Sequence, residues 1–284
     1  MSILKIITIK EYKENIEILE KIIEIISLKD SAEIKILNEI KMLNYFLKEL
    51  VERFKKLTKE LENDEKIGYY ELVRSTYEFS LIILFILYDK KLIYNKLVCY
   101  DYVLNYCVKE NLRNLLKSEE LLKELNEKFN NDIFKVLDEQ IIIIKSIFEI
   151  ENMLNNSNYS MVKQEFEKYC KEQKYPKFYH CYCNGKIKNI KSLAEYIDKF
   201  QSYETLYNVT SAISHGENLR LREDISLIRT GTFEFNFIVC EIVRKLGLYY
   251  CNIAESHNWE ERIKSKLGKN YPKFFERLNN TKKP

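Results

Sequence analysis

The 284-residue chain contains only six glycines and three prolines. Sandwiches and barrels need a turn roughly every 8–12 residues, and collagen or Pro/Gly-rich disorder needs many of both residues, so this scarcity argues against all of them. The chain also lacks an apolar stretch of the ~20 residues that a membrane helix needs. Its most apolar run, 79–88, is short and is flanked by Glu78 and Asp89. With 46% hydrophobic and 31% charged residues, the composition predicts a soluble, mostly helical protein with no membrane partner.

The N-terminal Met-Ser-Ile-Leu-Lys has no charged start, no smooth apolar stretch and no small-residue cleavage site. These are the features of a signal peptide, so we expect a cytoplasmic location. The seven cysteines are an odd number, which argues against a complete disulfide framework and predicts reduced thiols. We expect Cys99, Cys107, Cys240 and Cys251 to be small core residues, because each lies among apolar helix positions.

Several common catalytic and cofactor signals are missing from the chain. It has no Gly-rich phosphate loop, no Gly-x-Ser-x-Gly elbow and no His-Glu-x-x-His motif. The stretch from His180 to Cys183 suggests zinc, with Cys170 upstream, but Cys181 and Cys183 are separated by one residue and no second pair exists. Structural zinc usually takes two paired Cys-x(2–4)-Cys knuckles. We therefore predict no metal and no cofactor.

Apolar residues recur at helical spacing along almost the whole chain, as in the stripe Ile16, Leu19, Ile22, Ile23 and Ile26. This pattern predicts an all-α multi-helix bundle. After a first helix that carries this stripe, we expect helices over 31–61, 65–89, 91–117, 118–129, 131–154, 160–172, 192–199, 203–215, 233–257 and 272–278. The predicted domains are an N-terminal helical hairpin over 1–62, a helical core over 63–258 and a basic segment over 259–284.

The predicted helix over 65–89 carries polar residues before it becomes apolar all round. Glu71, Arg74 and Glu78 lie three and four residues apart and share one face, with Ser75 beside them. Charged groups that lead into a core must be paired or used, because a buried lone charge is costly. Two interpretations stay open: Arg74 is held between two carboxylates as a structural element, or the residues form a polar functional site.

A second polar group follows in the predicted helix over 203–215. Tyr207, Ser211 and His215 recur at spacing four, with Ser214 beside the histidine. Histidine is the usual general acid or base near neutral pH, and a nearby hydroxyl or carboxylate can orient it. His215 followed by Gly216 also has the pattern of an ordinary helix end, where glycine takes the capping position. Both interpretations are compatible with the sequence.

The C-terminal end is strongly basic. Residues 262–284 contain Glu276 as their only acidic residue and eight basic ones: Arg262, Lys264, Lys266, Lys269, Lys273, Arg277, Lys282 and Lys283. Such a segment could contact phosphates, and we name Lys264, Lys266, Lys269, Lys273 and Arg277 as candidate nucleic-acid contacts. A solvated helical face with a frayed end is the alternative.

Taken in order, these segments resemble a family of helical prokaryotic proteins known as domain of unknown function 5677. The resemblance rests on the Arg-Ser-x-x-Glu stretch from Arg74 to Glu78, on the aromatic and Lys/Gly-containing loop 177–186, and on the Tyr207, Ser211, His215 ridge with its glycine. It covers roughly residues 65–255. This family is similar to HEPN-type bundles, so the resemblance implies a HEPN-like core.

Many HEPN-like proteins are metal-independent ribonucleases of toxin and antiphage systems, in which an Arg-x(4–6)-His motif is duplicated across a dimer. Here the matching positions before His215 hold Asn208, Val209 and Thr210. The guanidinium would therefore come from Arg74, Arg220 or Arg222. The resemblance thus implies RNA as substrate, His215 as general acid or base, Arg74 on the phosphate and Glu78 orienting either group, with Glu71, Ser75, Tyr207, Ser211 and Ser214 around them.

Two functions follow as alternatives. The first is an RNA-cleaving toxin or antiphage defence component that needs no metal and forms a homodimer. The second is a non-catalytic helical module that binds a protein or a small ligand in a defence or toxin–antitoxin system. Its protein partner would be an antitoxin or another subunit of the system, and its Glu-Arg-Glu/His residues would form a buried structural network.

Overall fold

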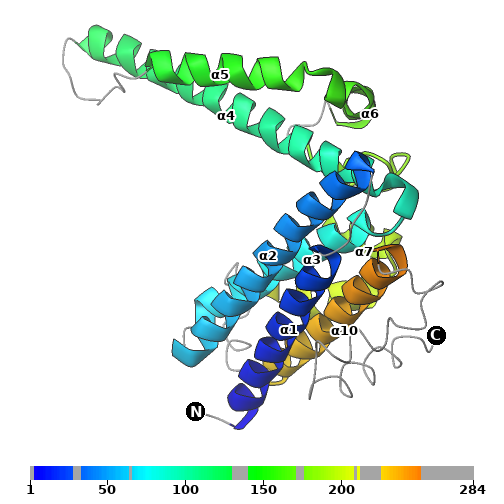
Figure 1. The fold of residues 1–284 in the computed structure, drawn as a ribbon. Helices are drawn as coiled ribbons and strands as arrows, with labels where there is room; N and C mark the ends of the chain where they lie inside the picture. Colours follow the sequence, from blue (N-terminus) through cyan, green and yellow to red (C-terminus); the bar gives the residue numbers. More distant parts are fainter. Residues whose placement is uncertain are drawn as a thin grey trace. The chain divides into compact units, whose positions relative to one another are not determined.

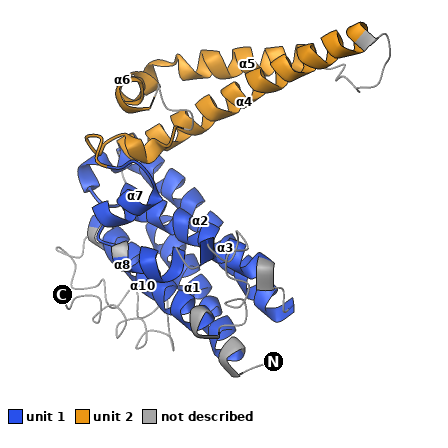
Figure 2. Cartoon of the chain, turned by 180° about the vertical axis from the view of Figure 1, so that it is seen from behind, with its two compact units in different colours: residues 1–94, 187–284 blue, residues 95–186 orange. Residues whose placement is uncertain are grey.

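The computed structural model describes residues 3–27, 33–63, 66–129, 140–170, 176–207, 210–211 and 225–250. These residues form helices, turns and short connections and contain no strand, so the prediction of an all-α multi-helix bundle is confirmed. The chain divides into two compact units (Figure 2). Unit 1 comprises residues 1–94 and 187–284, and unit 2 comprises residues 95–186.

Four long helices build unit 1 (Figure 1): α1 (Ile3–Ser27), α2 (Ile34–Asn63), α3 (Lys66–Ile86) and α10 (Ile225–Tyr250). Helix α1 packs against both α2 and α10, and α3 packs against α2 and α10. Contact between α1 and α2 agrees with the predicted N-terminal hairpin. The hairpin is part of unit 1, however, because α3 and α10 cover it.

Short elements complete unit 1: η1 (Lys90–Leu92), α7 (Ile190–Tyr196), α8 (Phe200–Ser202) and η4 (Tyr203–Tyr207). Asn189 caps α7, since its side chain accepts a hydrogen bond of 2.9 Å from the backbone amide of Ser192. The five residues of η4 form a π-helical turn, a form that is rare and often found at functional sites. Both α7 and η4 contact α3.

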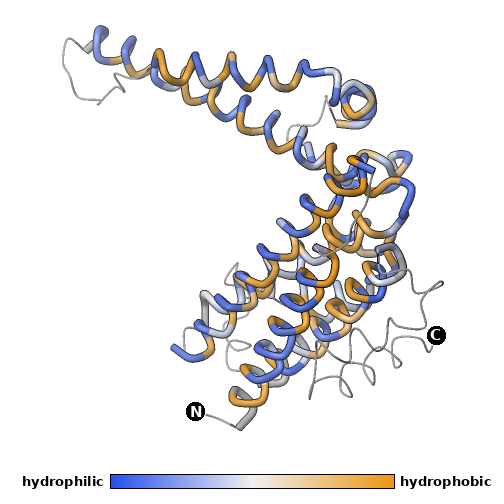
Figure 3. The backbone as a smooth tube through the Cα atoms, viewed as in Figure 1, coloured by the Kyte–Doolittle hydropathy of each residue, from blue (hydrophilic) through white to orange (hydrophobic). Residues whose placement is uncertain are grey.

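The core of unit 1 is rich in aromatic side chains. Tyr12 of α1, Phe54 of α2 and Phe235 of α10 are fully buried, and the Phe54 ring centroid lies 5.7 Å from that of Tyr12 and 5.4 Å from that of Phe235. These distances are those of favourable aromatic pairs. Figure 3 shows the apolar positions recurring as stripes along the helices, as expected for amphipathic helices around a shared core.

Unit 2 contains most of α4 (Ile93–Phe129), followed by α5 (Gln140–Leu154), η2 (Ser157–Tyr159), α6 (Ser160–Tyr169) and η3 (Phe178–His180). Helices α4 and α5 lie side by side (Figures 1 and 2) and run antiparallel. Arg113 of α4 forms an ion pair with Glu151 of α5, and Lys123 donates a hydrogen bond of 3.0 Å to Gln140.

The predicted break between helices at residues 117 and 118 is wrong, because α4 runs through both positions. The hydroxyl of Ser118 donates a hydrogen bond of 3.0 Å to the carbonyl of Asn114, one turn back in the same helix. Of the other predicted helices, 272–278, the first part of 131–154 and the last parts of 160–172, 203–215 and 233–257 lie outside the described residues.

The predicted domains over 1–62, 63–258 and 259–284 differ from the two units that the structure defines, and the last of the three lies outside the described residues. No described helix is long and apolar enough to cross a membrane. The six described cysteines are free thiols, and Cys99 and Cys240 are buried as predicted, whereas Cys107 is half-buried. Cys251 lies outside the described residues.

Candidate functional site

Arg74 contacts groups from two elements of unit 1. Its Nη2 donates a hydrogen bond of 3.1 Å to the hydroxyl of Tyr207 on η4, and its Nε lies 3.4 Å from Oε1 of Glu78, one turn further along α3. The guanidinium carbon also lies 5.1 Å from the centroid of the Tyr207 ring, within the range of a cation–π interaction. The guanidinium is therefore held in place by a carboxylate, a hydroxyl and an aromatic face.

The ionisation of these groups follows from their surroundings. Burial by itself would lower the pKa of Arg74, but the hydrogen bonds and charge interactions with Tyr207 and Glu78 outweigh it and raise the pKa. Burial, together with the charge of Glu78, raises the pKa of the Tyr207 hydroxyl. At neutral pH the pair is thus a cation beside a neutral phenol, and the phenol is not a base.

Other tyrosines surround the Tyr207 ring. Tyr203, at the start of η4, stacks on it with a centroid distance of 5.0 Å and an interplanar angle of 24°. Tyr77 of α3 lies 6.2 Å away and donates a hydrogen bond of 3.3 Å to the carbonyl of Lys199, just before α8. The two contacts of Tyr77 and the Arg74 hydrogen bond join α3 to the segment 199–207. Arg74 is therefore part of the packing between these elements.

The structure gives the other predicted residues of α3 different surroundings. Ser75 accepts a hydrogen bond of 3.4 Å from Arg53 of α2 and donates one of 3.2 Å to the carbonyl of Leu72. Glu71 is exposed, and no ion pair joins it to Arg74. Of the two carboxylates expected beside Arg74, the described residues thus provide Glu78 alone.

The structure describes only some of the remaining predicted site residues. Ser211 is helical and half-buried, whereas Ser214 and His215 lie outside the described residues. The candidate nucleic-acid contacts also lie outside them: Lys264, Lys266, Lys269, Lys273 and Arg277. Among the predicted residues, the structure therefore brings together Arg74, Glu78 and Tyr207.

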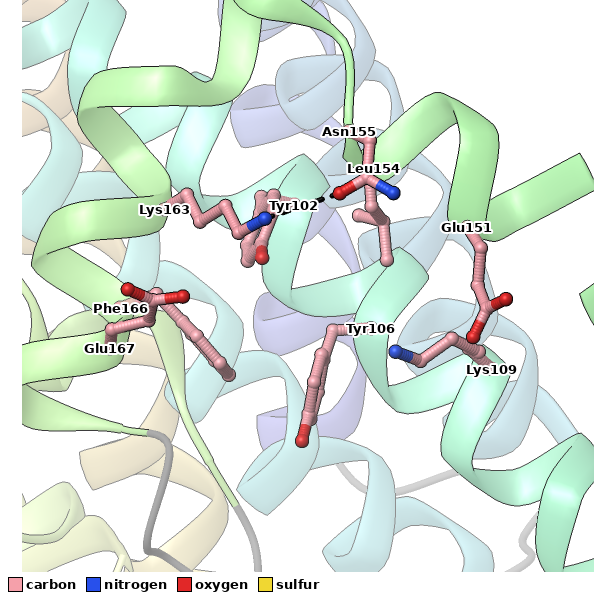
Figure 4. A pocket seen from close by; sticks show the side chains of 9 residues that line it. All are labelled: Tyr102, Tyr106, Lys109, Glu151, Leu154, Asn155, Lys163, Phe166 and Glu167. Atoms are coloured by element: carbon pink, nitrogen blue, oxygen red, sulfur yellow. Dashed lines mark hydrogen bonds between the residues drawn. The ribbon is translucent and has the colours of Figure 1, made fainter. Parts of the chain in front are cut away.

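A cavity in unit 2 was not predicted from the sequence. It has a volume of about 370 Å³ and lies between α4, α5 and α6 (Figure 4). Helix α4 contributes Tyr102, Tyr106 and Lys109, and α6 contributes Lys163 and Glu167. On each helix these residues are three or four positions apart, which is the one signal in the sequence that could have grouped them.

The described residues contain no group of three or more His, Cys, Asp or Glu side chains that could hold a metal ion. The thiols of Cys170 and Cys181 in unit 2 are buried, and their Sγ atoms lie 3.3 Å apart. The hydrogen bond with Cys181, followed by burial, raises the pKa of the Cys170 thiol. Against the opposing effect of Cys170, the contact with Cys99 and burial raise the pKa of Cys181, so neither thiol is a reactive thiolate at neutral pH.

Comparison with known proteins identifies no relative. No family model matches the chain, and no curated protein and no solved structure is significantly similar to it. The resemblance to domain of unknown function 5677 and to HEPN-type bundles stays a prediction.

Proposed function

We propose that the chain is a non-catalytic helical binding module, of the kind that the sequence resemblance implies for prokaryotic defence or toxin–antitoxin systems. In this role Arg74, Glu78 and Tyr207 stabilise the packing of η4 on α3. The observation that carries the proposal is the three-sided engagement of the Arg74 guanidinium by the Glu78 carboxylate, the Tyr207 hydroxyl and the Tyr207 ring.

A phosphate-binding arginine offers two parallel N–H donors of its planar fork to the ligand. Here Nη2 donates to Tyr207 and Nε lies beside Glu78. A phosphate that bound through Nη2 or Nε would compete with Tyr207 or with Glu78 for these donors. It would also face the negative charge of Glu78, which favours the structural role over phosphate binding.

RNA cleavage without metal is the second candidate. It is favoured by partial exposure, since the side chains of Arg74 and Glu78 remain 28% and 39% exposed. It is also favoured by the contact between Arg74 and Tyr207, because Tyr207 precedes His215 by only eight positions. In that case His215 would move the proton of the RNA 2′-hydroxyl and Arg74 would bind the phosphate.

One experiment separates the two functions. The wild type and the variants Arg74→Ala and His215→Ala are incubated with total RNA in EDTA, and the RNA ends and the melting temperature of each protein are measured. We expect intact RNA with all three proteins and a lower melting temperature for Arg74→Ala. Cleavage by the wild type that leaves 2′,3′-cyclic phosphates, and that is lost in both folded variants, would overturn the proposal.

Arg53 offers a matched control for the loss of an arginine. It lies on α2, forms an ion pair with Glu49 at 3.0 Å and stacks on Phe79 at 4.6 Å, so Arg53→Ala also removes a half-buried guanidinium. RNA cleavage that is lost in Arg74→Ala but kept in Arg53→Ala would assign a specific role to Arg74. Equal behaviour of both variants is the result that the structural role predicts.

A further inference from the structure

The cavity of unit 2 combines an aromatic wall with charges of both signs. Tyr106 and Phe166 form the wall, with ring centroids 4.7 Å apart. Lys109 and Lys163 enter from α4 and α6, and Figure 4 shows their ammonium groups pointing inward from different sides. Its volume of about 370 Å³ is at the small end of the range of ligand-binding pockets.

The Lys109 ammonium is held in place beside the Tyr106 ring of this wall. Its side chain is only 12% exposed, lies 4.8 Å from the centroid of Tyr106 and is 3.5 Å from Oε1 of Glu110. That carboxylate is shared, because Arg113 binds the same Glu110 oxygen at 2.8 Å. An ammonium that is largely removed from water gains from a second anionic partner, so this position favours a ligand carboxylate.

The ionic groups contributed by α6 differ from those on α4 in their partners. Lys163 donates a hydrogen bond of 3.1 Å to the amide oxygen of Asn155, which is a neutral acceptor. Glu167 forms no ion pair among the described residues, whereas the other carboxylate of the lining, Glu151, is bound by Arg113. One cation and one anion on α6 are therefore available to a ligand.

The charges of the lining also limit what the cavity can bind. Two lysines and two glutamates give no net charge. A nucleic acid would need an excess of cations along its phosphates, and a simple cation or anion would face two groups of its own sign. A molecule that carries both charges and a flat apolar part fits all of these groups.

We propose that this cavity binds a small aromatic zwitterion, namely a free aromatic amino acid. The ligand carboxylate lies between the ammonium groups of Lys109 and Lys163, its ammonium group faces Glu167, and its ring packs against Tyr106 and Phe166. This site lies entirely within unit 2, so it does not depend on the role of Arg74 or on the proposed function.

The test is isothermal titration calorimetry of the full chain with phenylalanine, tyrosine and tryptophan. Three analogues each remove one feature: 3-phenylpropionate lacks the ammonium, 2-phenylethylamine lacks the carboxylate and alanine lacks the ring. We expect at least one aromatic amino acid to bind and each matching analogue to bind about tenfold more weakly or worse, as expected when a charged hydrogen bond or an aromatic contact is lost.

Variants test the position of the site. Lys163→Gln and Glu167→Gln should each weaken binding about tenfold, while Lys168→Gln should leave it unchanged. Lys168 is a matched control, because it is a lysine of the same helix that lies over Tyr169 and does not line the cavity. Circular dichroism melts show whether each variant is folded.

Three results would overturn the proposal. The first is that none of the three amino acids binds. The second is that 3-phenylpropionate or 2-phenylethylamine binds as tightly as phenylalanine. The third is that Lys168→Gln and Lys163→Gln weaken binding equally. A variant that fails to fold is replaced by Asn155→Ala, which removes the neutral partner of Lys163. Unchanged affinity in that folded variant would also contradict the site.

Discussion

The two units differ in where their large apolar side chains lie. Unit 1 buries an aromatic core, with Tyr12 and Phe54 at 0% exposure, although some of its large side chains, such as Tyr45 at 68%, are exposed. In unit 2 large apolar side chains are exposed on α5, with Ile141 at 80% and Phe148 at 62%, while lysines and glutamates surround a cavity. The contrast predicts that substitutions in the aromatic core of unit 1 cost more stability than substitutions on the exposed face of α5.

The sharpest test of this contrast compares two phenylalanines. Phe54→Ala should lower the free energy of unfolding by about 3–5 kcal/mol, because it removes a buried ring that packs on Tyr12 and Phe235. Phe148→Ala should change it by less than about 0.5 kcal/mol, because the ring is largely in solvent. Urea unfolding followed by circular dichroism measures both, and equal costs would refute the contrast.

The buried tyrosines of unit 1 make its stability fall at high pH. Burial raises the pKa of Tyr12 to about 12, although its hydrogen bond to Tyr69 acts against this rise. The folded state therefore holds the proton more tightly than the unfolded state. This contribution is complete below pH 10 and is lost as the pH rises through 12, by up to about 1.4 kcal/mol per pH unit.

Unfolding in urea at pH 8, 9, 10 and 11 measures this slope. We expect a smaller loss of stability per pH unit above pH 10 for Tyr12→Phe than for the wild type. Tyr45→Phe serves as the control, because Tyr45 is 68% exposed on α2 and should leave the slope unchanged. If the free energy of unfolding falls equally with pH for the wild type and Tyr12→Phe, the pKa of Tyr12 is not raised by burial as the structure indicates.

Much of the fold could be predicted from spacing along single helices. The three-four pattern of apolar residues located most helices, and the interval from Arg74 to Glu78 predicted that both lie on one face of a helix, where the structure has their ion pair. The wrong break before Ser118 shows the limit of such rules. A serine can bond back to the preceding turn as well as cap a new helix, and the sequence does not say which.

Contacts between distant helices could not be predicted. Arg74 and Tyr207 are 133 positions apart, and their hydrogen bond depends on how η4 packs on α3. The cavity of unit 2 depends in the same way on the packing of α4, α5 and α6, although Lys163 and Glu167 are one turn apart in sequence. Spacing predicts which residues share a helix face, whereas tertiary packing decides which faces meet.

A smaller effect tests the helical hairpin of unit 2. Arg113 joins α4 to Glu151 of α5 at the surface, with 42% of its side chain exposed. Exposed ion pairs contribute little, so Arg113→Ala should cost at most about 1 kcal/mol. Its effect should also shrink in 1 M salt, where surface charges are screened. A loss of several kcal/mol that persists in salt would show that this hairpin is held together far more firmly than the contrast between the units implies.

The smallest effect is expected for the exposed apolar residues of α5. Ile141→Ser and Ile142→Ser should each change the free energy of unfolding by less than about 0.5 kcal/mol, because 80% and 57% of these residues are already exposed. Denaturant unfolding again provides the measurement. A cost as large as that of a core substitution would mean that a partner or a second copy covers this face in solution.

The most direct test of the structural role of Arg74 is a double-mutant cycle with Arg74→Met and Tyr207→Leu, measured by urea unfolding. The account predicts that the two residues stabilise the fold jointly, with a coupling energy of about 1 kcal/mol or more. Additive effects, with a coupling energy indistinguishable from zero, would contradict it. In that case Arg74 would not stabilise the fold through its contact with Tyr207 between α3 and η4.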